Sequence, residues 1–375
     1  MTDELIYQDL AHIPIVDNHC HLFDTTWRQH DLPALINMSL NAMPPDQLRL
    51  TMIYRKLLRE LRSFLDVEDA ADDTVLRIRE ERMRSDYPKW VGDLLSHGGI
   101  DTLVVDLGYK PATQSLDEFE GLVPAKTFYM FRIESVLDDL WRKFNAGELS
   151  FVEVEERFDA SLRENMANSR MVAFKTIIGY RTGIEIQPVE RADLLHAAAS
   201  EKAFRDYFFL QTLSRAAEVG MPVQIHASFG ESNIDQRRNH PGMLKWIFDQ
   251  PAFATVPMVI VHGGYPHCFE AGYLASVYPN VYVDMSEMIP FVPFGSRQGL
   301  RDIFDMCPFN KILYGSDGFV TPEIHWLGAR MARDSMTALL AEYIAAGLFD
   351  RDLALEVAGM VFADNATRLY RLEEP

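Results

Sequence analysis

Eight short apolar runs recur along the chain, and helical patterns lie between most of them. Each run has the length of a β-strand, and strands that alternate with helices pair in parallel through right-handed crossovers. We therefore expect an α/β fold in which the strands close into a (β/α)8 or TIM barrel. The predicted strands cover residues 13–22, 102–107, 128–134, 171–177, 222–227, 257–263, 281–285 and 311–315.

The chain is longer than such a barrel requires. A plain barrel needs ~250 residues, whereas this chain has 375, so we expect one barrel domain over residues 1–375 with insertions. The segments at about 31–90 and 135–170 carry helical patterns. Each follows a strand and must leave from the C-terminal face of the barrel, where we predict that α-helical insertions form a lid.

The first predicted strand ends in Asp-Asn-His-Cys-His, residues 17–21. Alternate residues on a strand face the same way, so His19 and His21 point their imidazoles into one space. Two imidazoles held side by side by a rigid backbone are half of a transition-metal site. Neutral imidazole suits zinc, iron and nickel.

Residues for the other half of such a site stand at the ends of four later strands. Lys175, His226, His262 and Asp317 each follow an apolar run. Parallel barrels collect their catalytic groups from the C-terminal ends of several strands. One histidine at a strand end is more often a hydrogen-bonded structural residue than a ligand, but the joint occurrence at five strand ends favours a metal site.

Charge and composition narrow the range of partners. The formal net charge of −19 argues against nucleic acid and anionic membranes, because both are bound by clustered Lys and Arg. We find no apolar run of signal-peptide or membrane-spanning length, and the three cysteines form no C-x-x-C pair. We expect a cytoplasmic enzyme with a small-molecule substrate, while the oligomeric state, including a homo-oligomer, stays open.

The order of these candidate ligands resembles the amidohydrolase superfamily. Four runs are similar to its amidohydrolase-related branch, which occurs as free-standing bacterial proteins and fused to glutamine-synthetase-like domains in fungi and plants. The resemblance extends over nearly the whole chain. The runs are FKTIIGYRTG at 174–183, QIHASFG at 224–230, YLASVYP at 273–279 and YGSDG at 314–318.

The resemblance implies one or two divalent metals, with zinc as the expected ion. His19, His21 and Asp317 would hold the first, His226 and His262 the second, and Lys175 would bridge them as a carbamate. A free ammonium is a poor neighbour for a divalent metal, so a lysine here makes sense if it is neutral or carbamylated. The alternative is that Lys175 pairs with Asp317 beside a single metal.

These roles predict a hydrolase that cleaves an amide or related C–N bond. A metal-activated hydroxide would attack the carbonyl, and Asp317 would act as general base and then general acid, with His262 and Lys175 in the same catalytic centre. The branch resemblance suggests a γ-glutamyl amide as one substrate to test.

Three residues are candidates for substrate binding. Arg181 lies a few residues beyond Lys175, where a planar guanidinium can grip a substrate carboxylate, although a surface salt bridge is an equal alternative. Tyr265 and His267 follow His262 across a Gly-Gly turn and could reach the rim of the site.

Two other functions stay open. A mononuclear zinc decarboxylase of the same superfamily would use one metal and Asp317 for proton transfer. A catalytically silent, metal-stabilised binding or regulatory module is a further alternative, but such a module has no need for Asp317 beside an open coordination position. Nucleophile-elbow, P-loop and dinucleotide motifs are absent from the sequence.

Overall fold

The computed structural model describes residues 2–23, 31–109, 115–195 and 200–372. It confirms the predicted barrel, because eight parallel strands pair in sequence order from β1 to β8. Each predicted run overlaps one of them, although β2 and β3 each begin two residues earlier than predicted. The strands are β1 (Ile15–Cys20), β2 (Ile100–Asp106), β3 (Lys126–Arg132), β4 (Met171–Thr176), β5 (Val223–His226), β6 (Met258–Val261), β7 (Val281–Asp284) and β8 (Ile312–Leu313).

The barrel closes through the segment that follows the short strand β8. The amide of Asn18 donates to the carbonyl of Tyr314 at 3.0 Å, and the amide of Asp317 donates to the carbonyl of His19 at 2.8 Å. These bonds join the first strand to the end of the last. Barrel closure therefore involves the backbone of two predicted ligands.

Successive side chains along each strand point to opposite sides of the sheet. In β6, Val259 and Val261 belong to a small inner cluster, whereas Met258 and Ile260 pack into the larger core that contains the helices. Tyr370 joins the inner cluster from the C-terminal helix. The strands are rich in β-branched and other apolar residues, as expected for strands covered on both faces.

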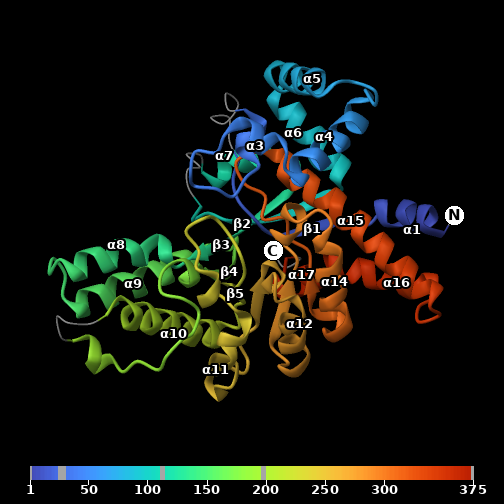
Figure 1. Ribbon diagram of the computed structural model, residues 1–375. Helices are drawn as coiled ribbons and strands as arrows, with labels where there is room; N and C mark the ends of the chain where they lie inside the picture. Colours follow the sequence, from blue (N-terminus) through green and yellow to red (C-terminus); the bar gives the residue numbers. More distant parts are fainter. Residues whose placement is uncertain (1, 24–30, 110–114, 196–199, 373–375) are drawn as a thin grey trace.

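Helices surround the strands, with α3–α6 gathered beside β1 and β2 and α8–α10 beside β3–β5 (Figure 1). The helices are α1 (Thr2–Ala11), α2 (Leu32–Leu35), α3 (Pro45–Arg49), α4 (Met52–Leu65), α5 (Asp72–Ser85), α6 (Tyr87–Gly98), α7 (Leu116–Glu120), α8 (Glu134–Asn145), α9 (Phe151–Met166), α10 (Glu201–Val219), α11 (Lys245–Phe248), α12 (Cys268–Val277), α13 (Met288–Phe291), α14 (Gly295–Met306), α15 (Pro322–Ala345), α16 (Arg351–Gly359) and α17 (Asn365–Tyr370).

Both predicted insertions are helical. In the first, α4 and α6 pack against α15 at the side of the barrel, and a loop carries Met38 and Leu40 to the cavity at the strand ends. The second insertion begins with α8, whose first turns also line that cavity. Whether either segment works as a lid stays a prediction. Within the described residues, we find no helix that is both long and apolar enough to span a membrane.

Candidate functional site

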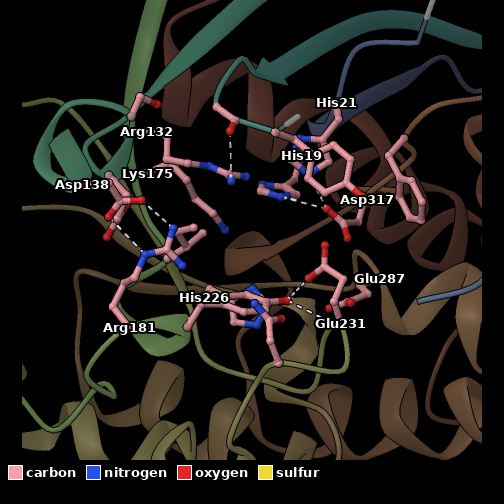
Figure 2. Close-up of a pocket in the computed structure, with 18 of the residues that line it drawn as sticks. His19, His21, Arg132, Asp138, Lys175, Arg181, His226, Glu231, Glu287 and Asp317 are labelled. Atoms are coloured by element: carbon pink, nitrogen blue, oxygen red, sulfur yellow. Dashed lines mark hydrogen bonds and ion pairs between the residues drawn. The ribbon is translucent and has the colours of Figure 1, made fainter. Parts of the chain in front are cut away.

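A cavity of about 750 Å³ opens at the C-terminal ends of the strands. Figure 2 shows Arg181 and Asp138 on one side of it and Glu287 and Asp317 on the other, with Lys175 between them. All six residues predicted as metal ligands line this cavity. They are His19, His21, Lys175, His226, His262 and Asp317.

His19, His21 and Asp317 form a compact buried group. The Nε2 atoms of both imidazoles lie 3.1 Å from Oδ1 of Asp317. Nδ1 of His21 donates to the carbonyl of Asp106 at 3.1 Å, and Nδ1 of His19 donates to Oε1 of Gln224 at 2.5 Å. Because these acceptors take the Nδ1 protons, a neutral form of either ring would present the lone pair of Nε2 to Asp317.

His226 and His262 form a second pair, with their ring centroids 4.6 Å apart. Nε2 of His226 donates to the carbonyl of Phe229 at 2.9 Å, which leaves its Nδ1 as a lone pair. Nδ1 of His262 donates to Oγ of Ser286 at 2.8 Å, and that hydroxyl donates onward to Asp284. Burial holds the pKa values of both histidines well below the ordinary range, so the rings are neutral.

Lys175 extends from β4 into the cavity and is only 1 % exposed. Its Nζ atom has no hydrogen-bond partner within the described part of the chain, and it forms no ion pair with Asp317. Burial lowers the pKa of this amine to about 8. An orphaned, readily deprotonated amine fits both a neutral lysine and one that has reacted with carbon dioxide.

The backbone around this site is strained. Six described residues other than glycine have positive φ, and three of them line the cavity: His262 at 67°, Glu287 at 56° and Asp317 at 52°. Gly315 precedes Asp317 in a crowded turn, where an added Cβ would lie 3.2 Å from Cβ of His19. Strain of this kind persists where the surrounding structure fixes it, often at functional sites.

Several charged residues that line the cavity were not predicted from the sequence, among them Glu287 and Arg132. Glu287 follows β7 by three residues, and Arg132 ends β3. Arg132 binds Asp106 with two nitrogens, at 2.8 and 2.5 Å. Glu287 and Arg132 stand at or just past strand ends, the same kind of position that indicated the six predicted ligands. Gln224 and Ser286, which accept hydrogen bonds from His19 and His262, were not predicted either, because nothing in their local sequence marks them.

The three predicted substrate-binding residues lie in different places. Arg181 lines the cavity, but its guanidinium bonds both carboxylate oxygens of Asp138, at 3.1 and 2.7 Å. Tyr265 and His267 are absent from the described residues that line the cavity. The ring of Tyr265 packs on Phe229, and that of His267 lies 4.1 Å from His240.

Known proteins share this sequence pattern and fold. A family model described as amidohydrolase matches residues 140–372. Protein fluG of Emericella nidulans is 26% identical over 404 residues, which cover 96% of this chain and 46% of fluG. The chain thus spans about half the length of this curated relative.

Solved structures match the whole chain. A Lactobacillus casei protein described as a metal-dependent hydrolase has a TM-score of 0.83 at 22% identity over 98% of both chains. A uronate isomerase of Bacillus halodurans has a TM-score of 0.68 at 13% identity, over 98% of this chain and 96% of the isomerase. These likenesses establish the fold and leave the reaction open, since hydrolase and isomerase descriptions share it.

The family model covers more than half of the chain and includes the candidate ligands from Lys175 to Asp317. The resemblance inferred from the sequence motifs is thereby confirmed, and the protein belongs to the amidohydrolase family.

Proposed function

We propose that the protein is a metal-dependent hydrolase that cleaves an amide or related C–N bond of a small, carboxylate-bearing substrate. One observation carries the proposal. The Nε2 lone pairs of His19 and His21 converge on Oδ1 of Asp317, each at 3.1 Å. Three acceptor atoms in this arrangement repel one another unless a cation lies among them, and two imidazoles with a carboxylate suit zinc.

Each nearby residue has a role that follows from its chemistry. A bound divalent metal, with zinc as the expected ion, supplies Lewis-acid activation of water and of the scissile carbonyl. Asp317 takes a proton from the attacking water and returns it to the departing nitrogen. Lys175, as a carbamate, would link the two histidine groups as an anionic ligand. His226 and His262 would hold a second ion.

The substrate carboxylate has two candidate partners on the cavity wall. Arg132 would have to share its guanidinium with Asp106, which binds Nε and Nη2, and with the carbonyl of Gly108, which Nη1 contacts at 3.4 Å. Arg181 would have to share its guanidinium with Asp138. γ-Glutamyl amides combine a carboxylate with a cleavable amide and are the first substrates to test. The cytoplasmic location and a homo-oligomeric state stay predictions from the sequence.

The test is turnover of a panel of amides, including γ-glutamyl amides, by zinc-loaded protein. Asp317→Asn should lower kcat by about 10²- to 10⁴-fold. Asp66→Asn is the matched control, because Asp66 also has positive φ, at 57°, but caps α4 outside the cavity. Hydrolysis of no amide in the panel by the loaded protein would contradict the proposal.

A mononuclear decarboxylase is the second candidate. The observation in its favour is that His19, His21 and Asp317 form a complete ligand group that needs no contribution from Lys175. In that case zinc content would stay near one per chain in both wild-type protein and Lys175→Ala, and carboxylic acids in the panel would release carbon dioxide. A silent binding module would instead gain stability with zinc, and Asp317→Asn would change no activity.

A further inference from the structure

Glu287 occupies an unusual position in the cavity. It is the central residue of a γ-turn, since the amide of Met288 donates to the carbonyl of Ser286 across it, and its φ and ψ are 56° and −51°. This turn is rare and strained for a residue with a side chain. The turn directs the carboxylate into the cavity, where Glu287 is only 4 % exposed. The fold thus holds a buried acid in a costly conformation.

One oxygen of the Glu287 carboxylate, Oε2, is buried without a hydrogen-bond partner among the described residues. The neighbouring acid Glu231, in contrast, accepts a hydrogen bond from the hydroxyl of Tyr180. Figure 2 shows Glu231, Glu287 and Asp317 together on one side of the cavity. A buried carboxylate oxygen without a partner is costly, and a bound cation would remove that cost.

Two imidazoles complete a possible ligand set around this carboxylate. His226, His262 and Glu287 each offer one ligand atom, and these atoms all lie within 4.8 Å of one another. The tautomers described above leave one lone pair on each imidazole. Two histidines and a glutamate are a known zinc ligand set that leaves a coordination position open.

We propose that Glu287 is a metal ligand, which together with His226 and His262 forms a three-residue site for a second divalent cation. The inference rests on the proposed function and deepens it. It gives the second ion a carboxylate ligand that does not depend on modification of Lys175. It also accounts for the strained turn, because a relaxed backbone at this position would move the carboxylate away from the two imidazoles.

The test is zinc binding by purified full-length protein at buffered free zinc concentrations, with bound metal measured by elemental analysis. Glu287→Gln should bind one zinc where wild-type protein binds two, with at least a tenfold loss of affinity at the second site. Glu134→Gln is the matched control. Glu134 is 3 % exposed, lines the same cavity and also has an unpartnered Oε2, but belongs to no histidine group. It should keep both ions.

Glu287→Gly separates ligand loss from misfolding. Glycine tolerates positive φ, so this variant should raise the melting temperature of the chelator-treated protein while the second zinc is still lost. Two bound ions with unchanged affinity in Glu287→Gln, or an equal loss in Glu134→Gln, would overturn the inference. One ion in wild-type protein, unchanged in Glu287→Gln, would also overturn it while leaving a one-metal enzyme intact. Wild-type protein that binds no zinc would refute the proposed function itself.

Discussion

Ser286 provides a sharp test of how the hydrogen-bond partner of His262 supports the proposed metal site. Its hydroxyl accepts the Nδ1 proton of His262 at 2.8 Å and donates to Asp284 at 2.7 Å. Ser286→Ala removes that single oxygen and adds no bulk. We expect the variant to fold but to bind zinc more weakly at the His226 and His262 site, because the imidazole loses the acceptor that fixes its tautomer and orientation.

The magnitude follows from the bonds that remain. Asp284 still accepts from the amides of His262 and Ser286, at 2.7 and 3.1 Å, so its Oδ1 stays satisfied. The group left without a partner is the buried Nδ1–H of His262, and an orphaned donor costs about 1–3 kcal/mol of stability. Loss of the hydrogen-bond partner of a metal ligand weakens metal binding by about 10- to 100-fold.

The assay is competition for zinc between the protein and a chromophoric chelator, with urea unfolding of the chelator-treated protein in parallel. Ser296→Ala is the matched control, since Ser296 is equally buried but its hydroxyl makes no hydrogen bond within the described chain. We expect Ser296→Ala to keep wild-type affinity. If both variants bind zinc equally well, the hydroxyl of Ser286 does not tune His262 and the reasoning fails.

Three further predictions concern Lys175, Gly315 and Glu60. The zinc content of the wild-type protein should rise with added bicarbonate, whereas the zinc content of Lys175→Ala should stay unchanged. Elemental analysis measures both contents. An equal rise in the two proteins would exclude a carbamate at Lys175. Gly315→Ala should lower the free energy of unfolding by about 1–3 kcal/mol, because the new Cβ would lie 2.8 Å from Nδ2 of Asn18 and 2.9 Å from Cβ of Ser286. Urea unfolding measures this, and an unchanged midpoint would count against these tight contacts. Burial alone would raise the pKa of Glu60, but the hydrogen-bonded ammonium of Lys56 helps to hold it below its ordinary 4.5. Glu60→Gln should therefore destabilise the protein at pH 7. The difference in unfolding free energy from wild type should shrink as the pH falls below 4.5 and through the lowered pKa. Urea unfolding measures this difference, which would stay constant across the pH range if the ion pair is unimportant.

Much of the barrel could be predicted because its strands are short apolar runs that no other local pattern resembles. The run at 311–315 was recognised even though β8 itself holds only two residues. The sequence does not predict that the C-terminal helix α17 contributes Tyr370 to the interior of the barrel. Tyr370 donates to Oδ1 of Asn18 at 3.0 Å inside the barrel, a contact across 352 residues of sequence. Such contacts depend on the closed barrel, so no local pattern encodes them.

The candidate site was only partly predictable. Six residues at strand ends were found because strand-end position and residue type together indicate a metal site, and the structure brings them into one cavity. Glu287 escaped notice because its place in the cavity depends on a strained turn. The predicted partner for a substrate, Arg181, is engaged by Asp138. That pairing could not be inferred, since α8 and the segment after β4 meet only in the folded protein.

The way the barrel closes also bears on how the chain folds. His21 and Asp317 are 296 residues apart in sequence, yet Nε2 of His21 lies 3.1 Å from Oδ1 of Asp317. An ion bound by both would act as a reversible cross-link across almost the whole polypeptide. Because the unfolded chain has no preformed site, this link would form only after the barrel closes, and binding would stabilise the folded state. Zinc would then hold the first strand to the segment after the last one, and a chelator would make the closed barrel easier to open.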